Sequence, residues 1–427
     1  MNVLAAILET FLAVAIVIIC AYAIRQYVFT FNRLFGRQRH PFVDIRTADW
    51  PTVAVLIPAH NEEAVIGDAL RALLAVDYPE DRITIVPIND KSTDRTAAIV
   101  DAFAARFPGR VVPLHRPYGG QGKSAALAEA TERTTSDIIV VFDADYLPPS
   151  GLMKRIVAPF FDPEVGAVMG RVVPENAGRN LLTRLLELER AGGYQVDQQA
   201  RMNLGLIPQY GGTVGGVRRT ALEQVGGWRL DSLTEDTDLT LRLCVQGWQI
   251  VYANRAECYE EVPVTWRARQ RQIDRWARGH NDVMRRCAWS LIRSGLPLKQ
   301  RLDGLLFLGV YALAPLILLS WVAALALFYI GRTSALPGVA VLTIASYSTM
   351  GNFAAFFEIA AAVQLDGQRE RVRLLPFLGV GFFVSLVAVS MAAIPRFRQR
   401  AAMGTPSPPQ WHKTPRCRPM TASELAT

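Results

Sequence analysis

The sequence predicts an α/β fold in which a parallel sheet, covered by helices on both faces, is inserted between membrane-spanning helices. Two observations lead to this prediction. Short all-apolar segments alternate with helical ones after residue 50, and both the first 24 residues and residues 303–395 are largely apolar. Short apolar strands that alternate with helices are typical of parallel sheets, whose strands are buried on both faces.

The expected elements follow from the spacing of apolar residues. The predicted strands are 53–58, 83–88, 111–114 and 138–142, and the predicted helices between them are 62–74, 93–105 and 124–131. Further along, we expect an amphipathic helix over 178–202, a glycine-rich turn region over 211–216, and a helix over 235–247. Gly247 is the expected stop of the last helix, because glycine accepts the left-handed backbone at a helix end.

Polar clusters follow three of the predicted strands. They are His60-Asn61-Glu62, Asn89-Asp90 and Asp143-Ala144-Asp145. The carboxyl ends of parallel strands lie at one edge of a sheet, and ligands bind beyond that edge. We therefore expect these clusters to form one site.

Three or four apolar stretches are long enough to cross a bilayer core of roughly 30 Å as helices. They lie at about 3–24, 304–330, 336–363 and 374–394. Arg25, Arg33, Arg37 and Arg39 follow the first stretch, so the positive-inside rule puts residue 25 onward in the cytoplasm. We expect a multi-pass integral protein of the plasma or inner membrane, without a cleaved signal peptide.

The fourth candidate span creates a conflict. Four spans from an outside amino terminus would leave the basic tail outside, against the positive-inside rule. Asn352 and Glu358 make 336–363 the segment to doubt, unless they mark a polar path in the membrane. The expected divisions are a transmembrane helix over 1–30, a basic linker over 31–49, a soluble domain over 50–263, amphipathic interface helices over 264–300, two or three spans over 301–395, and a basic tail over 396–427.

Composition narrows the possible partners. The formal net charge of +8 comes largely from arginines that flank apolar segments, and it suits an anionic lipid surface. No dense basic stripe interleaved with aromatic residues indicates a nucleic-acid partner. The five cysteines show no metal or disulfide spacing, which fits a reducing compartment.

Several acidic residues have both a functional and a structural interpretation. Asp143 and Asp145, in the turn after a strand, can hold a divalent cation that grips a diphosphate, although acidic residues also cap turns. Asp90 can accept a hydrogen bond from the ring N–H of a uracil, or cap the following helix. Glu235 or Asp236 can deprotonate an acceptor hydroxyl, or favour a helix N-terminus electrostatically.

The segment Gln272-Ile273-Asp274-Arg275-Trp276 lies just before the apolar region. An arginine here can stabilise a leaving pyrophosphate, and a tryptophan can stack on a sugar. Interfacial anchoring at a membrane is the alternative interpretation of the same pair.

In chain order the motifs are PAHNE (58–62), NDKSTD (89–94), GK (122–123), DAD (143–145), TED (234–236) and QIDRW (272–276). This order, with a membrane exit after the last motif, resembles the processive family 2 glycosyltransferases. These include the cellulose, hyaluronan, chitin and poly-N-acetylglucosamine synthases and the plant mannan synthase-like proteins. The resemblance covers about residues 50–280 and implies a GT-A domain, a Rossmann-like fold for nucleotide-diphospho-sugar transferases.

The resemblance implies a role for each matching residue. Asp236, with Glu235, is the catalytic pair of the TED motif, and Asp236 is the base. Asp145 and Asp143 hold a Mg²⁺ or Mn²⁺ ion with the donor diphosphate. The implied donor-binding residues are Pro58, Ala59, Asn61, Glu62, Asp90, Lys123, Asp143 and Arg275, and the implied acceptor-binding residues are Gln272, Trp276 and Thr234.

The chain departs from the family pattern at three positions. Asn89 precedes Asp90 where an aspartate is usual, Lys91 stands where a glycine is usual, and His60 stands where a tyrosine is frequent. These changes leave the identity of the nucleotide open between UDP, which Asp90 favours, and GDP as in GDP-mannose. Gly122-Lys123-Ser124 is no P-loop, because Pro117 occupies the position of the required earlier glycine.

The resemblance implies an inverting membrane glycosyltransferase that adds sugar from a nucleotide-sugar to a growing β-linked polysaccharide in a processive manner. The alternative is a non-processive enzyme that glycosylates a membrane lipid of the ceramide or diacylglycerol type, because those relatives also carry an RW-type motif. A scaffold with a degenerate domain would lack an acidic residue of the proposed catalytic and metal sites, and Asp143, Asp145, Glu235 and Asp236 are all present. Trp411 and Arg416 in the tail loosely resemble a gating segment of hyaluronan and chitin synthases.

Overall fold

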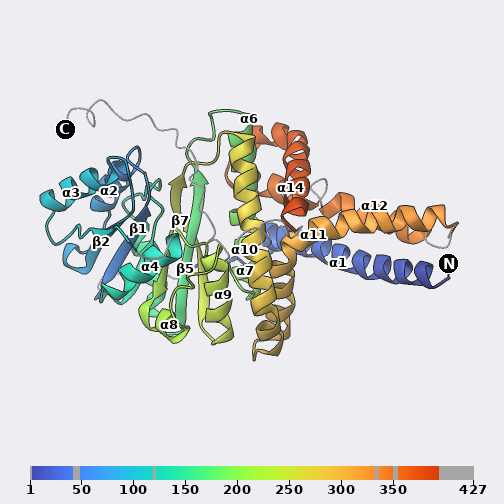
Figure 1. The fold of residues 1–427 in the computed structure, drawn as a ribbon, viewed down its shortest axis with the longest axis horizontal. Coiled ribbons are helices and arrows are strands. Elements are labelled where there is room, and N and C mark those ends of the chain that lie inside the picture. The colour runs from blue at the N-terminus through green and yellow to red at the C-terminus, as the bar shows by residue number, and fades with distance from the viewer. Residues whose placement is uncertain (1, 42–48, 119–121, 332–335, 350–353, 394–427) are drawn as a thin grey trace.

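The computed structural model describes residues 2–41, 49–118, 122–331, 336–349 and 354–393. It shows an α/β domain from which long apolar helices extend (Figure 1). The domain is built on a seven-stranded sheet with the order β3-β2-β1-β4-β6-β5-β7. The strands are β1 (Val53–Ala59), β2 (Ile83–Asp90), β3 (Leu114–Arg116), β4 (Ile138–Val141), β5 (Val165–Pro174), β6 (Gly215–Arg218) and β7 (Gln249–Glu260). The proposed tail residues Trp411 and Arg416, and Asn352, lie outside the described residues.

The four strands predicted from the sequence form the parallel half of the sheet. β1 pairs in parallel with β2 and β4, and β2 pairs in parallel with β3. The expectation of a wholly parallel sheet is wrong, because β6 runs antiparallel to both β4 and β5. β6 begins within the segment expected to be a glycine-rich turn, 211–216, and extends to Arg218. Its glycines give no apolar strand signal, yet a Cβ on Gly216 would lie 2.9 Å from the Phe160 ring.

Helices cover both faces of the sheet. Alternate residues of β1 face opposite sides: Val53, Val55 and Ile57 lie in the core beneath α2 (Ile66–Leu74), whereas Ala54 and Leu56 lie in the core beneath α4 (Lys123–Glu132). This is the period-two pattern of a strand buried on both faces. The other helices of the domain are α3 (Thr96–Arg106), α5 (Leu152–Val157), α8 (Arg219–Gln224) and α9 (Glu235–Val245), and the short 3-10 turns are Glu80–Arg82 and Ala158–Phe161. As predicted, Gly247, beyond the end of α9, has a positive φ of 91°.

The helix predicted over 178–202 is interrupted by a π-helical segment. α6 (Leu181–Ala191) continues into η3 (Gly192–Gln198), which is π-helical, and then into α7 (Gln199–Leu204). A π segment shifts the helix register by about one residue and is frequent at functional sites. Here it brings Gln195 and Asp197 toward the helices that leave the domain.

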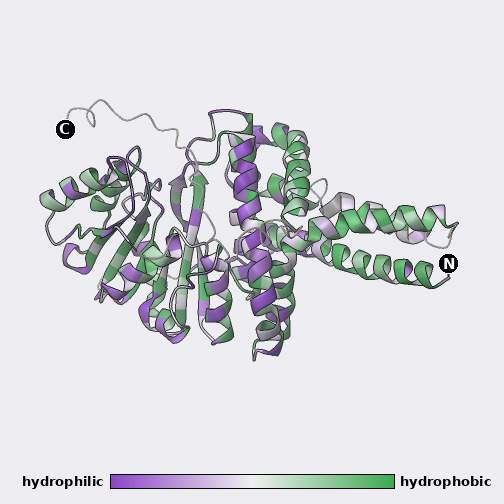
Figure 2. Cartoon of the chain, in the orientation of Figure 1, coloured by the Kyte–Doolittle hydropathy of each residue, from purple (hydrophilic) through white to green (hydrophobic). Residues whose placement is uncertain are grey.

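Within the part of the chain that the structure describes, three helices are long and apolar enough to cross a membrane: Val3–Phe35, Leu298–Tyr329 and Arg369–Ala392. The first is α1 (Asn2–Phe35), the second is α11 (Leu298–Tyr329), and the third combines the 3-10 helix η5 (Arg369–Phe377) with α14 (Leu378–Ala393). α1 and α12 (Leu336–Thr349) extend away from the sheet as the apolar arm visible in Figure 2, and α11 packs along α1. The predicted interface region is mainly one helix, α10 (Trp266–Arg293).

Within the described residues, the segment 336–363 contains two helices, α12 and α13 (Ala354–Leu365), which have 14 and 12 residues. At 1.5 Å per residue these helices are roughly 21 and 18 Å long, shorter than a bilayer core. Residues 350–353 between them lie outside the described residues, so the expectation for 336–363 stays a prediction.

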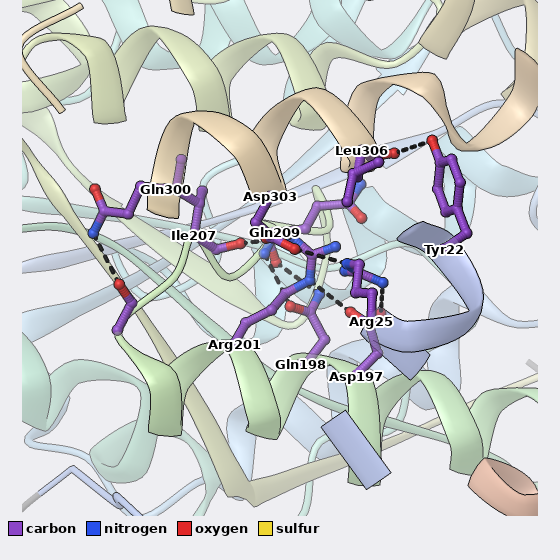
Figure 3. Close-up of polar contacts among 11 residues, drawn as sticks. Tyr22, Arg25, Asp197, Gln198, Arg201, Ile207, Gln209, Gln300, Asp303 and Leu306 are labelled. Atoms are coloured by element: carbon purple, nitrogen blue, oxygen red, sulfur yellow. Dashed lines mark hydrogen bonds and ion pairs between the residues drawn. The ribbon is translucent and has the colours of Figure 1, made fainter. Parts of the chain in front are cut away.

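Two arginines and two aspartates form a closed ring where the apolar helices meet the domain (Figure 3). Arg25 contacts Asp197 at 3.1 Å and Asp303 at 2.7 Å, and Arg201 contacts the same two aspartates at 2.6 and 3.1 Å. We call these four residues the ion quartet. They come from α1, η3, α7 and α11, so the quartet joins two candidate membrane spans to the π-helical segment.

The ion quartet is largely removed from water. The side chains of Arg25, Arg201 and Asp303 are 12%, 4% and 7% exposed. Buried charges of this kind are tolerated only when each has a partner, and removal of one partner leaves an uncompensated charge. The quartet is neutral as a whole. Its four ion pairs hold α1, η3, α7 and α11 together.

Replacement of Asp303 by alanine should destabilise the protein by on the order of 3–5 kcal/mol, because two buried arginines lose a shared carboxylate. Thermal unfolding in detergent measures the effect. The matched control is Asp49→Ala, which removes a 3.0 Å contact to Arg82 from a side chain that is 86% exposed. A surface pair of this kind contributes about 0–1 kcal/mol. Equal melting temperatures for the two variants would contradict a structural role of the quartet.

Candidate active site

The polar clusters after β1 and β2 meet at one edge of the sheet, as the sequence predicts. The backbone carbonyl of Asp90 lies 2.7 Å from His60 Nδ1, and the backbone N–H of Asn61 donates to Ser92 Oγ at 3.0 Å. Asn61 also accepts from the Thr93 N–H at 2.7 Å. Asn61 has a positive φ of 55°, so the chain turns sharply there, and α2 begins at Ile66 instead of the predicted residue 62.

Lys123 joins the DAD motif to the TED motif. Its ammonium group contacts Asp143 Oδ1 at 2.6 Å, donates to the Gly212 carbonyl at 2.9 Å, and lies 3.9 Å from Glu235 Oε1. Burial disfavours the charged form, but the two carboxylates outweigh it, so the pKa of Lys123 lies above its ordinary value. Carboxylates from loops more than ninety residues apart are thus held around one cation.

Gly212 allows the TED motif to approach this cluster. It has a φ of 71°, and a Cβ at this position would lie 3.0 Å from Asp236 Cβ and 3.5 Å from Glu235 Oε1. Any other residue would combine a strained left-handed backbone with crowding of the two acidic side chains. The glycine-rich segment is therefore part of the site.

The two carboxylates of the TED motif have different surroundings. Glu235 is 8% exposed and faces Lys123. Burial, opposed by Lys123, raises its pKa to about 7. Asp236 is partly exposed, and its Oδ1 accepts the Thr237 N–H at 2.7 Å. Asp236 is therefore the more accessible of the two.

The remaining nucleotide-side residues are divided between exposed and buried positions. Asp90 is paired with Arg116 at 2.8 Å, a contact that no sequence pattern predicts. Glu62 and Ala59 are 2% and 3% exposed, and the Glu62 N–H donates to Thr96 Oγ1 at 2.8 Å. These two residues shape the loop after β1, next to Pro58.

Asp145 is buried at the same edge of the sheet, with only 3% of its surface exposed. Asp143 and Asp145 provide hard oxygen ligands that suit a divalent cation. Within the described ranges, no group of three or more His, Cys, Asp or Glu side chains is arranged to hold a metal ion.

The QIDRW motif lies on α10 and contributes to two regions. The charge of Arg275 acts on Glu235, which places this arginine near the TED motif. Two guanidinium groups lie over the ring of Trp276, those of Arg190 and Arg269, at 5.4 and 5.5 Å from its centre. Gln272 accepts from Arg269 at 2.9 Å.

A cavity of about 130 Å³ adjoins this tryptophan. It is lined by Leu186, Glu189, Arg190, Val262, Pro263, Arg269, Gln272 and Trp276. Arg190 also pairs with Glu260 at 2.7 Å, and Glu260 accepts from the Tyr146 hydroxyl at 2.8 Å. Because Tyr146 follows the DAD motif directly, this chain of contacts links the two ends of the site. A larger hollow of about 350 Å³, lined by residues such as Thr84 and Ser136, lies at the opposite edge of the sheet and is separate from the site.

Two contacts around the TED motif, those of Gly279 and Tyr210, were not anticipated from the sequence. Thr234 is 4% exposed and packs against α10, where a Cβ on Gly279 would lie 2.4 Å from Thr234 Cγ2. Tyr210 is fully buried, and the carboxylates of Glu235, Asp236 and Asp143 act on its hydroxyl. The only sequence feature that could have indicated a role for Gly279 is its position three residues after the QIDRW motif.

Residues 51–279 match the family model described as "Glycosyltransferase like family 2". The match covers more than half of the 427 residues, so the chain belongs to this family and carries a family 2 glycosyltransferase domain.

Among curated proteins, the chain is 37% identical over 262 residues to "Probable glycosyltransferase YdaM" of Bacillus subtilis, which covers 61% of each chain. It is 38% identical over 236 residues to the β-monoglucosyldiacylglycerol synthase of Synechocystis sp., covering 55% of this chain and 49% of that protein. It is 28% identical over 284 residues to glucomannan 4-β-mannosyltransferase 7 of Arabidopsis thaliana, covering 62% and 51%. The chain thus spans about half to three fifths of the length of these relatives.

Among solved structures, the fold is similar to that of the mannosyltransferase PcManGT from Pyrobaculum calidifontis, solved in complex with GDP-Man and Mn²⁺. The TM-score is 0.58 at 21% identity, and the similarity covers 87% of this chain and 99% of that one. This likeness confirms the predicted GT-A fold.

The raised pKa of Glu235 predicts how stability depends on pH. The folded-state pKa of Glu235 is about 7, above the ordinary 4.5. Its contribution to the free energy of unfolding is therefore fully present below pH 4.5 and is lost as the pH rises through 7. Glu235→Gln cannot ionise. Between pH 5 and 8 it should therefore lose less stability than the parent, by on the order of 1–3 kcal/mol. Unfolding measured across this pH range tests the prediction, and identical slopes for the two proteins would contradict it.

Proposed function

We propose that this chain is an inverting hexosyltransferase that moves a sugar from a nucleotide-sugar to the hydroxyl group of a membrane-held acceptor. One observation carries the proposal. Asp143, Lys123, Glu235 and Asp236 converge at the carboxyl edge of a GT-A sheet, and helices suited to a membrane lie directly beyond α10.

The donor end of the site suits a nucleoside diphosphate. Asp145 and Asp143 would hold a Mg²⁺ or Mn²⁺ ion, which when bound neutralises charge on the departing diphosphate. The remaining ligands of that ion would come from the donor phosphates. Arg275 contributes a second positive charge on the side of the TED motif. Asp90, held by Arg116, would accept a hydrogen bond from the nucleobase of the donor, which favours UDP. GDP-mannose stays an alternative donor, because the relatives include a glucomannan mannosyltransferase.

Asp236 is the proposed general base. It takes the proton from the acceptor hydroxyl as the oxygen attacks the anomeric carbon from the face opposite the diphosphate. The bond from that carbon to the phosphate oxygen breaks, and the electron pair leaves with the diphosphate. One displacement inverts the configuration, so an α-linked donor gives a β-linked product. Glu235, turned toward Lys123, sets the charge balance around the base.

A lipid hydroxyl is the acceptor that the observations favour. The motifs alone also fit polymer synthesis, but among the described residues only three helices are long enough to span a membrane. Two of these helices, α1 and α11, pack against each other through apolar side chains. The diacylglycerol glucosyltransferase relative is also more similar to this chain, at 38% identity, than the glucomannan synthase at 28%.

Processive synthesis of a β-linked polysaccharide is the second candidate. It is supported by the complete QIDRW motif and by the small cavity beside Trp276, where the end of a glycan could be bound. Trp276 is flanked by Arg190 and Arg269, which would orient its ring for such contact.

The catalytic domain is proposed to lie on the cytoplasmic side of the membrane. Arg25 and Arg33 at the domain end of α1 support this orientation. With three spans, the basic carboxyl-terminal tail would also lie on the cytoplasmic side, which removes the conflict that four spans create.

Asp236→Asn should fold and bind donor but turn over about a hundred to ten thousand times more slowly, because the amide cannot accept the acceptor proton. Release of nucleoside diphosphate by the purified protein measures the rate. Asp274→Asn, which removes a partly exposed carboxylate paired with Arg278 on α10, is the matched control and should stay within about threefold of the parent. Near-normal turnover of the Asp236 variant would refute the assignment of the base.

The acceptor is tested with purified protein in vesicles that contain diacylglycerol or ceramide, supplied with radiolabelled UDP-glucose or GDP-mannose. A lipid acceptor predicts a labelled product that extracts into organic solvent and carries one sugar or a few. Labelled material that stays in the aqueous phase, or is retained as long polymer, would support the processive candidate instead.

A further inference from the structure

His280 lies next to the proposed base but belongs to none of the motifs. It is on α10, one helical turn beyond Trp276, and is 7% exposed. Its Nε2 lies 3.1 Å from Thr237 Oγ1. Thr237 is the residue whose N–H donates to Asp236 Oδ1 at 2.7 Å, and its hydroxyl lies 3.4 Å from the same oxygen.

The Thr237 hydroxyl has a second polar neighbour. Gln209 Nε2 donates to Thr237 Oγ1 at 3.1 Å, and the Gln209 backbone is itself held by Gln198 of η3 at 2.9 and 3.2 Å. Figure 3 shows Gln198 and Gln209 beside Arg201 and Asp197 of the ion quartet. The hydroxyl can accept two hydrogen bonds and donate one. If both neighbours donate, its own hydrogen points to Asp236.

The surroundings of His280 favour this direction of donation. Among the described residues, its Nδ1 has no hydrogen-bond partner. An unpaired buried lone pair is more common than an unpaired buried N–H, so the proton is better placed on Nε2. The other neighbours are apolar ring faces, with Tyr311 and Phe307 of α11 at 4.8 and 5.7 Å between ring centres. Burial lowers the pKa of His280 to about 4, so the ring stays neutral and adds no positive charge beside the base.

We propose that His280 is a positioning residue, which fixes the carboxylate of Asp236 by donating from Nε2 to the Thr237 hydroxyl. The proposal rests on the proposed function, because it takes Asp236 to be the base. The close packing of α10 on the TED loop at Gly279 holds the imidazole in reach of Thr237. In this way the helix that carries the QIDRW motif also orients the group that activates the acceptor.

The experiment compares three replacements of His280. Glutamine can place an N–H donor where Nε2 stands, asparagine can place one only near Nδ1, and leucine keeps the volume without a donor. We expect kcat to fall about tenfold for His280→Leu and His280→Asn, which corresponds to one hydrogen bond, and to stay within about threefold for His280→Gln. The KM for the nucleotide-sugar should change less than twofold, because the donor pocket is not altered.

Thr237 gives an independent test. Thr237→Val should lower kcat about tenfold, and Thr237→Ser should recover most of it. The double variant His280→Leu with Thr237→Val should be no slower than either single variant, because both act through one hydroxyl. If the leucine variant does not fold, as judged by its melting temperature and by binding of UDP or GDP, the two threonine variants decide.

Asp236→Asn is measured in the same series. If that variant retains activity, the base is wrongly assigned and the proposed function fails first. If it is inactive while His280→Leu has the parent kcat, only the positioning role fails. Equal rates for the glutamine and asparagine variants, or effects that multiply in the double variant, would also overturn the proposal.

Discussion

The ammonium group of Lys123 lies between the carboxylates of Asp143 and Glu235, at 2.6 and 3.9 Å. Without it, two acidic loops would face each other across a largely buried space, where like charges repel strongly. The same ammonium group holds the Gly212 carbonyl, and Gly212 in turn leaves room for Asp236. The donor end of the site and the proposed base are therefore held together by one partly buried cation. Its loss would disturb both ends at once.

A second set of buried charges connects this site to the apolar helices. The ion quartet joins α1 and α11 to η3 and α7, and the adjacent pair Gln198 and Gln209 continues toward Thr237. The base is thus approached by polar contacts from two directions, the membrane-side junction and α10. This arrangement fits the proposed membrane-held acceptor, because polar contacts connect two candidate membrane helices to the residue next to the proposed base.

The local elements of the parallel half could be predicted because each carries its own signal. β1, β2 and β4 are runs of apolar residues, and the polar clusters that follow them lie together because parallel strands end at one edge. β6 could not be predicted, since Gly215 and Gly216 show no strand pattern and become a strand only between β4 and β5. The π-helical turn at Gly192 had no signal that distinguished it from an ordinary helix.

The sequence by itself determined the reaction class, the family resemblance and most of the candidate residues, because short motifs at strand ends keep their chemistry whatever surrounds them. Tertiary structure alone decided which of these residues meet. Lys123 reaches the TED motif, Arg116 pairs with Asp90, and His280 reaches Thr237, over separations of 112, 26 and 43 residues. No local pattern encodes such pairs, since they depend on how the sheet order and the packing of α10 bring distant segments together. The physical reason is that side-chain hydrogen bonds and ion pairs act over only a few ångströms.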